Sequence, residues 1–395
     1  MTVSSESILP SFASVRATLP LGEPGTLVGR VWDPAVGGPS PVVVLDGGVH
    51  DLSRTYATVR DLCEEPRPAK AAREAAGAVL GSVDELLEGT AAATATGPRL
   101  LAPVDLQSVK AAGVTFAVSM LERIIEERVN GDLAAAASLR QQILAEIGAD
   151  LTSVRPGSQD AEKLKAFLTE RGLWSQYLEV GIGPDAEIFT KAPTLAAVGT
   201  LGPVGVPPHS TWNNPEPEVA LVISSRASIV GATLGNDVNL RDVEGRSALL
   251  LPQAKDNNAS CALGPFVRLF DETFSLEDVR SLTVELEIRG ADGFELRDSS
   301  PMTQISRQPE DLVEQLFRSH QYPDGAVLML GTLFAPVVDR ATEGLGFTHH
   351  PGDVVRISAP QLGALVNEVR HCEDCEPWSF GLRDLMANLA ERRLL

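Results

Sequence analysis

The sequence predicts an α+β fold, in which a small β unit and a helical segment precede a larger mixed β domain. Two runs of β-branched residues come first, between about residues 25 and 52. Apolar residues at helical spacing and strong helix formers then dominate about residues 117–173. After Trp174, short β-type runs alternate with clusters of Gly, Pro and Asn.

These shifts divide the 395-residue chain into three predicted parts. Residues 1–100 form an N-terminal β and helical domain, which begins with a loose arm of about 25 residues rich in Ser and Pro. Residues 101–174 form a connecting segment and helical lid. Residues 175–395 form the β domain that we expect to carry the site.

Individual elements follow from local patterns. The N-terminal β unit is expected at LVGRVW and PVVVLDGGVHDLS, with the turn-forming cluster DPAVGGPS between them. From 57 to 95 the pattern is helical, and REAAGAVLGSVDELLEG is its clearest piece. The strands of the β domain are expected at EIFTKAP, EVALVISS, IVGATLG, SLTVELEIRG, AVLMLGT, DVVRISAP and ALVNEV.

The bulk composition excludes several function classes. The formal charge of −20 argues against nucleic acid and anionic membrane surfaces, because binding phosphate needs a basic face. No apolar stretch of about 18 residues is present to span a membrane. The first 20 residues lack the basic start and apolar core of a signal peptide, and four cysteines in so long a chain are typical of reduced thiols, so we expect a cytoplasmic protein.

Two groups of His and Cys residues are candidate metal ligands. His371, Cys372 and Cys375, in HCEDCEP, resemble half of a zinc site, but no second pair with similar spacing exists, which favours a solvent-facing loop. His349 and His350, in FTHHPGD, are expected to be solvated loop residues.

An acidic cluster is the strongest chemical signal. Glu216 and Glu218 flank Pro217 just before an apolar run, and residues two apart in a strand point to one side, about 7 Å apart. If residues 219–224 and 229–234 form a hairpin, Asp237 returns to the same end. Three carboxylates there would suit Mg²⁺ or Mn²⁺. The alternative is a solvated, negatively charged sheet end.

Five ordered segments resemble signatures of the fumarylacetoacetate hydrolase superfamily: EIFTKAP, HSTWNNPEPEVAL, GNDVNLRDVEGRS, QAKDNNASCALGPF and LMLGTLFAP. The similarity covers about residues 105–370. In that family the E-x-E pair and the later Asp bind a divalent metal, usually Mg²⁺, which implies Glu216, Glu218 and Asp237 as ligands here. The resemblance also implies a homodimer or homotetramer that takes a small-molecule substrate.

The residues of these motifs resemble those of the 2-keto-3-deoxy-pentonate dehydratases of oxidative pentose breakdown. The implied reaction converts 2-keto-3-deoxy-D-xylonate or -arabinonate into 2,5-dioxopentanoate by loss of a C3 proton and the C4 hydroxyl. Around residue 113 the chain keeps Gly113 and Glu122 of the pattern G-x-N-Y-x-x-H-x-x-E, but Ser119 replaces its His. That His serves hydrolase and decarboxylase relatives, so its absence disfavours the main alternative, C–C hydrolysis or decarboxylation of acylpyruvate- or oxaloacetate-like acids. A third hypothesis is that the protein is a non-catalytic, ligand-binding relative of these enzymes.

The resemblance implies three residues for proton transfer. Lys255 matches a family lysine near the metal, and a cation together with partial burial would lower its pKa. Glu187 and Lys191, four apart, could pair on one face of a strand. Either Lys255 or Glu187 is the expected base at C3, and the other member of the cluster is the acid.

Substrate contacts are implied at further positions. Thr332 resembles a family residue that hydrogen-bonds the substrate carboxylate, with a turn hydroxyl as the alternative role. Ser119 and Glu122 are expected to close over the sugar end from the lid. Arg241, in NLRDVEG, is expected to be a structural partner of an acid.

Overall fold

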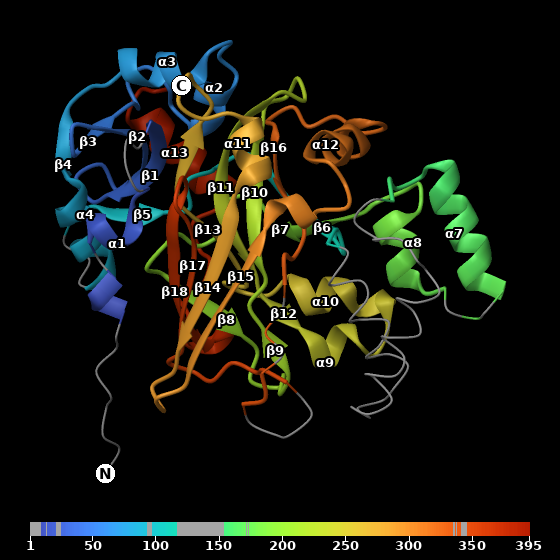
Figure 1. Ribbon diagram of the computed structural model, residues 1–395. Coiled ribbons are helices and arrows are strands. Elements are labelled where there is room, and N and C mark those ends of the chain that lie inside the picture. The colour runs from blue at the N-terminus through green and yellow to red at the C-terminus, as the bar shows by residue number, and fades with distance from the viewer. Residues whose placement is uncertain are drawn as a thin grey trace.

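Two β-sheets packed face to face form the centre of the molecule (Figure 1). The computed structural model describes residues 9–12, 14–20, 25–92, 97–116, 154–170, 172, 174–334, 336, 338–340 and 346–395. Within these residues the larger sheet has 11 strands, in the order β4-β3-β2-β1-β13-β11-β10-β16-β6-β7, with β5 paired to β1. The smaller sheet has five, in the order β15-β14-β17-β18-β8.

The strands of the larger sheet come from both halves of the chain. They are β1 (Thr26–Asp33), β2 (Gly38–Leu45), β3 (Gly48–Asp51), β4 (Val79–Ser82), β5 (Arg99–Leu101), β6 (Ser108–Gly113), β7 (Glu187–Ala192), β10 (Pro217–Ile223), β11 (Ile229–Asp237), β13 (Cys261–Leu269) and β16 (Ala326–Met329). The smaller sheet contains β8 (Pro203–Val206), β14 (Thr283–Arg289), β15 (Glu295–Pro301), β17 (Val354–Ala359) and β18 (Gly363–His371). A separate short pair joins β9 (Asn213–Asn214) to β12 (Asn239–Leu240).

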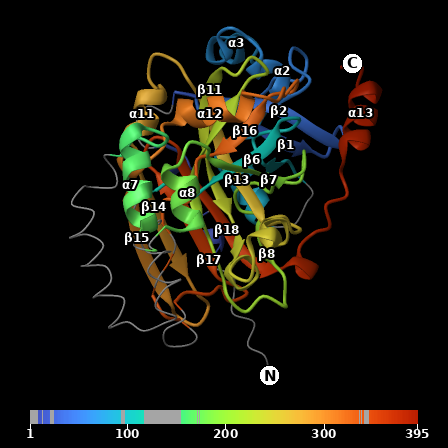
Figure 2. The ribbon, with the colours of Figure 1, turned by 90° about the vertical axis from the view of Figure 1, so that its right-hand side faces the viewer.

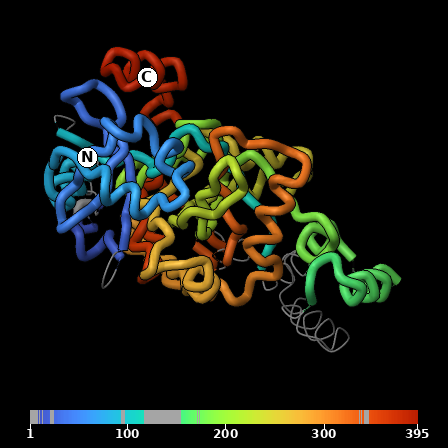
Figure 3. The backbone as a smooth tube through the Cα atoms, turned by 90° about the horizontal axis from the view of Figure 1, so that it is seen from above, coloured from blue at the N-terminus to red at the C-terminus, as the bar shows by residue number. Residues whose placement is uncertain are grey.

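Helices cover the rims and outer faces of the sheets. The N-terminal ones are α1 (Val15–Thr18), α2 (Val59–Cys63), α3 (Pro68–Glu74) and α4 (Val83–Ala91), and those beyond residue 153 are α7 (Gln159–Glu170), α8 (Gln176–Ile182), α9 (Arg241–Glu244), α10 (Leu251–Lys255), α11 (Leu276–Ser281), α12 (Pro309–Phe317) and α13 (Leu382–Glu391). Figures 1 and 3 both show α7 and α8 projecting to one side of the sheets. Figure 2 shows the C-terminal α13 at the edge of the molecule, where it contacts β2. Among the described helices none is long and apolar enough to cross a membrane.

Alternation along the strands creates two apolar layers, one on each face of the larger sheet. On β10, Val219 and Leu221 face the smaller sheet and pack with residues of β14, β17 and β18. Ala220 and Val222 face the other way, into a layer that α2 and α3 complete. Every residue of β10 is buried, so neither face of this strand is exposed to solvent. Packing against the two apolar layers therefore determines which side chains point to which face.

Most predicted strands are confirmed. The two N-terminal runs form β1, β2 and β3, and the seven runs expected in the β domain form β7, β10, β11, β14, β16, β17 and β18. The α+β class is confirmed as well. The division at residues 100 and 174 stays a prediction. β1 pairs with β13, so the larger sheet is continuous between the first and last predicted parts.

Three expectations need correction or lie outside the described residues. The helical stretch at 57–95 is interrupted by β4, which pairs with β3 because Val79 and its neighbours complete the sheet edge. The described part of the expected loose arm is packed against the protein, since Leu9 and Phe12 are buried in an apolar cluster with β1 and β2. Of the helical stretch predicted at about 117–173, α7 is observed, and the part at 117–153 lies outside the described residues. α8 was not predicted, since it begins after Trp174, where strands were expected.

Arg307 fixes the approach to β7, the strand that carries two predicted site residues. Its buried guanidinium donates to the carbonyl oxygens of Val180 (3.0 and 2.8 Å), Gly183 (2.8 Å) and Asp185 (3.1 Å). The adjacent Ser306 donates its backbone N–H and its hydroxyl to Thr115 O. Residues 306 and 307 therefore tie the end of β6 to the turn that leads into β7.

Replacing Arg307 with Ala should lower the free energy of unfolding by about 2–3 kcal/mol, because one buried and two partly buried carbonyl oxygens lose a charged donor. Chemical denaturation of the purified protein measures this change. Arg297→Ala is the matched control: Arg297 is exposed and pairs with Glu287 at 3.1 Å, so its loss should cost about 0.5 kcal/mol or less. Equal losses in the two variants would contradict the role assigned to Arg307.

Candidate metal centre

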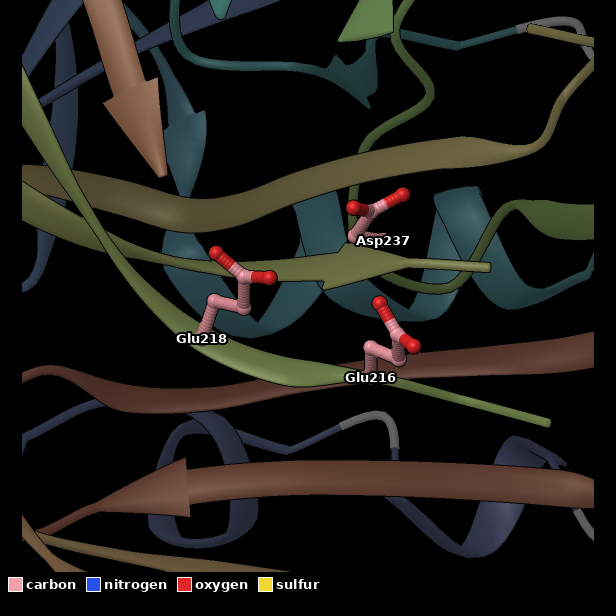
Figure 4. Close-up of side chains that lie close together, drawn as sticks. All are labelled: Glu216, Glu218 and Asp237. Atoms are coloured by element: carbon pink, nitrogen blue, oxygen red, sulfur yellow. The ribbon is translucent and has the colours of Figure 1, made fainter. Parts of the chain in front are cut away.

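The β10–β11 hairpin brings three carboxylates together. Its register pairs Pro217 with Asn236, which sets Asp237 beside the end of β10. One oxygen from each of Glu216, Glu218 and Asp237 lies within 4.8 Å of the others, and the side chains point toward one another (Figure 4). The geometry expected from the hairpin is confirmed, and the alternative of a solvated sheet end is wrong, since all three residues are at most 2% exposed.

Two lysines reach this cluster. Lys255 lies at the end of α10, and its Nζ is 2.5 Å from Glu216 Oε2 and 3.0 Å from Asp237 Oδ2. The Nζ of Lys191, on β7, is 2.8 Å from Asp237 Oδ1. Asp237 thus has one ammonium group within 3.0 Å of each carboxylate oxygen. Three carboxylates and two ammonium groups leave one net negative charge in a buried space.

The remaining negative charge affects the pKa of Glu218. Burial raises the pKa of Glu218 well above its ordinary value, and the neighbouring Asp237 and Glu216 raise it further. Lys255 and the backbone N–H of Gly331, which donates to Glu218 Oε2 at 2.7 Å, offset only part of this effect. A divalent cation would offset the repulsion among the three carboxylates. An all-oxygen donor set suits Mg²⁺ or Mn²⁺. The residues present therefore fit such an ion.

The carboxylates around Lys255 control its pKa when no cation is bound. Burial lowers the pKa of Lys255, but the Asp237, Glu216 and Glu244 carboxylates together outweigh burial, and the net shift is upward. This favours the ammonium form without a cation, and the neutral amine expected beside a bound cation stays a prediction. The ring centroid of Phe189 lies 5.7 Å from its Nζ and adds a further contact that favours the cation.

Lys191 does not pair with Glu187, contrary to the expectation that residues four apart share a face. The β6–β7 ladder shifts register between Val109 and Lys110, and Lys191 is the extra residue of this bulge. Its completely buried ammonium contacts Val238 O, Lys255 O and Ser260 Oγ besides Asp237. With every donor engaged, Lys191 fixes Asp237 and the end of α10.

Glu187 lies at the start of β7, opposite Gly113 of β6. Thr332 follows Gly331 after β16, and its hydroxyl lies 3.4 Å from Glu218 Oε1. Thr332 is thus next to the carboxylate cluster, where the resemblance implied it. Ser119 and Glu122 lie outside the described residues, so their expected contacts stay predictions.

The other candidates lie apart from the cluster. His349 is buried rather than solvated: its Nδ1 lies 3.0 Å from Asn213 Oδ1, and burial, with Arg340 and His350 nearby, lowers its pKa to about 3. The guanidinium of Arg241 lies over the ring of Trp212, at 5.0 Å from its centroid. Among the described residues, the acidic triad is the one cluster with metal-ligand spacing, and His371, Cys372 and Cys375 do not form another.

Sequence reasoning missed three groups that support the cluster. Asn239 Nδ2 donates to Glu216 Oε1 at 3.0 Å and to Glu244 Oε2 at 2.6 Å. Asn236 Oδ1 accepts from the backbone N–H of Glu216. Gly331 acts through its backbone. The two asparagines lie on either side of Asp237 in the segment GNDVNL, so the sequence could have indicated them as its neighbours. The backbone N–H of Gly331 could not be predicted in this way, because every residue type except proline has one.

Comparison with known proteins gives the same assignment for the β domain. Residues 176–370 match the family described as fumarylacetoacetate (FAA) hydrolase, C-terminal. The chain is 32% identical over 184 residues to a 2-dehydro-3-deoxy-D-arabinonate dehydratase of Saccharolobus solfataricus, a match that spans 47% of this chain and 58% of that protein. It is 29% identical over 265 residues to a probable 2-keto-3-deoxyxylonate dehydratase of Haloferax volcanii, across 61% of this chain and 88% of that one.

A solved structure shares the fold. It is described as 2-keto-3-deoxy-D-arabinonate dehydratase complexed with magnesium and 2,5-dioxopentanoate. The similarity has a TM-score of 0.61 at 23% sequence identity, and it covers 87% of this chain and 99% of that chain. The predicted fold class, an α+β fold of the fumarylacetoacetate hydrolase type, is therefore confirmed.

The raised pKa of Glu218 predicts how pH controls cation binding. Without a divalent cation, the folded protein holds a proton on Glu218 at pH values where the unfolded chain has lost it. The resulting stability is present below the ordinary Glu pKa and is lost as pH rises through the raised pKa. Because a cation needs the ionised carboxylate, we expect stabilisation by Mg²⁺ to grow with rising pH over the same range.

Thermal unfolding in EDTA and in saturating Mg²⁺, at several pH values between about 5 and 8, measures this difference in melting temperature. Glu218→Gln should abolish both the stabilisation by Mg²⁺ and its pH dependence. Asp298→Asn, at an exposed acid on β15, should retain both. Stabilisation of the wild type that does not change with pH would contradict the role of Glu218.

Proposed function

We propose a dehydratase function from one premise: residues 176–370 belong to the fumarylacetoacetate hydrolase C-terminal family. The relatives at 32% and 29% identity are named as dehydratases of 2-keto-3-deoxy-pentonates. We infer that this chain dehydrates the same class of substrate, a 2-keto-3-deoxy-D-pentonate, to 2,5-dioxopentanoate. The observation that carries the proposal is the buried contact of the Lys255 ammonium group with Glu216 and Asp237, inside a carboxylate triad that fits a divalent cation.

Glu216, Glu218 and Asp237 would hold the cation, with Mg²⁺ as the first choice and Mn²⁺ as the alternative. When bound, the ion would supply positive charge beside the keto oxygen of the substrate and so favour loss of a proton from C3. Asn239 and Gly331 orient the carboxylates of Glu216 and Glu218 by hydrogen bonding. The Thr332 hydroxyl, at the edge of the triad, would donate to the substrate carboxylate.

The proton transfers divide between Glu187 and Lys255. Glu187 would accept the C3 proton, since a carboxylate is a base at neutral pH. Lys255 would donate a proton to the departing C4 hydroxyl, which leaves as water, because its neighbours keep it in the ammonium form. Two proton shifts then convert the resulting unsaturated alcohol into the aldehyde, so that the net change is loss of one water. Lys191 takes no part, since its donors are engaged with protein groups.

The purified protein should form 2,5-dioxopentanoate from racemic 2-keto-3-deoxypentonate, and EDTA should abolish the activity. Lys255→Met should lower kcat by about 10²- to 10⁴-fold, the usual contribution of a positioned acid or base. Lys110→Met is the matched control: Lys110 is a half-buried lysine on β6 whose Nζ donates to Thr190, so its loss should leave turnover intact. Aldehyde formation is followed with a coupled dehydrogenase assay.

Acylpyruvates and oxaloacetate, offered in parallel, test the hydrolase and decarboxylase alternative. Turnover of these acids with none of the pentonate would replace the proposal. Magnesium binding with no turnover of any of them would indicate a non-catalytic relative.

A further inference from the structure

The conformation of Glu187 depends on a missing side chain on the neighbouring strand. Gly113 lies directly opposite Glu187 in the β6–β7 ladder. A Cβ added at Gly113 would lie 1.9 Å from Glu187 Oε2, 2.7 Å from its Cδ and 3.2 Å from its Cγ. The Glu187 side chain is therefore folded across the backbone of β6, in the space that any other residue at position 113 would fill.

Strand alternation shows which face of the sheet this is. Val109 and Ala111 of β6 pack in the apolar layer on the face away from the smaller sheet, so Gly113, two residues further on, shares that face. Phe189, two residues after Glu187, packs against the same layer, and its ring contacts Lys255. The carboxylate of Glu187 thus lies on the face to which Lys255 belongs.

The carboxylate triad lies on this face as well. Ala220 of β10 packs in the same layer, and Glu218, two residues before it, points the same way. Between Glu218 and Glu187 lie only β16 and β6, because the strand order is β10-β16-β6-β7. Neighbouring strands are about 4.8 Å apart, so a side chain folded over β6 is about one strand spacing closer to the triad.

A second glycine lies between the triad and the end of β6. Gly331, whose N–H donates to Glu218, follows β16. A Cβ added there would lie 2.0 Å from Thr115 Oγ1 and 3.1 Å from Ala112 O. The segment after β16 is therefore closely packed against residues 112–115, and the Thr115 hydroxyl occupies the space that a side chain at position 331 would need.

We propose that Gly113 is a positioning residue, whose lack of a side chain directs the Glu187 carboxylate over β6 toward the carboxylate triad. This inference rests on the proposed function for the role of Glu187 as a base. Displacing a base by about 1 Å can slow a reaction by about 10²-fold, so the effect on turnover is large even though Gly113 contacts no reacting atom.

Gly113→Ala is the direct test. Gly113 does not have the positive φ that would exclude alanine, and the atoms in conflict are the far end of a flexible side chain, so the variant should fold and bind Mg²⁺ as the wild type does. We expect kcat to fall by about 10²-fold and the melting temperature to change by no more than about 2 °C. Gly97→Ala is the control, because an added Cβ there has no heavy atom of the described residues within 4 Å.

A double-mutant cycle separates positioning from a general structural effect. If Gly113 acts through Glu187, Gly113→Ala in a Glu187→Gln background should cause no further loss of kcat. A full additional 10²-fold loss in the double variant would overturn the proposal, as would a Gly113→Ala variant with wild-type kcat.

Crystal structures of the wild type and Gly113→Ala decide the positional claim without any turnover. A displaced Glu187 carboxylate on an unchanged β6 supports it, even if the wild type fails to dehydrate the pentonate and the proposed function falls. A carboxylate that keeps its place while β6 moves overturns it.

Discussion

The site depends on one electrostatic constraint: three carboxylates occupy a buried space in which two ammonium groups cannot neutralise them. Buried charge is costly unless it is paired, so this arrangement persists only because the surrounding sheet determines it. Glu216 and Glu218 are fixed by β10, Asp237 by β11, and each strand is buried on both faces. The stability needed to hold such a cluster comes from the two apolar layers, and the unbalanced charge of the carboxylates would favour binding of a cation.

The hairpin alone does not complete the centre. β7 brings Lys191 and Phe189 from an earlier part of the chain, α10 brings Lys255, and the segment after β16 brings the Gly331 N–H. Arg307 fixes the turn that leads into β7, so the positions of Glu187 and Lys191 depend on a residue that touches neither of them. The centre is thus an intersection of four segments, and the sheet order, rather than any one motif, determines which segments meet.

Sequence reasoning reached the parts of this centre that follow from short-range periodicity. The E-x-E spacing and an assumed hairpin indicated that Glu216, Glu218 and Asp237 could converge, because both depend on strand alternation within about 25 residues. The family resemblance, rather than the spacing, favoured this over a solvated sheet end. Lys191 was paired with the wrong residue, since the bulge opposite Val109 and Lys110 depends on a strand some 80 residues earlier. The upward shift of the Lys255 pKa in the absence of a cation was not predicted, because it results from opposing effects of burial and three carboxylates whose balance needs distances. β13 was not predicted as a strand, since Pro265 interrupts its pattern, although it lies at the centre of the larger sheet.

The two lysines of the cluster differ in role: Lys191 holds protein groups together, and Lys255 is the proposed proton donor. Lys191 is completely buried and donates to three protein oxygens besides Asp237, so moving its proton would break several contacts at once. Lys255 has ion pairs with Glu216 and Asp237 and one aromatic neighbour, and both carboxylates would be drawn to an incoming cation. A cation that competes for those oxygens weakens the hold on the Lys255 proton and leaves Lys191 in place. In the proposed mechanism, cation binding and proton availability would therefore be coupled at Lys255 and separated from Lys191, which keeps the centre assembled.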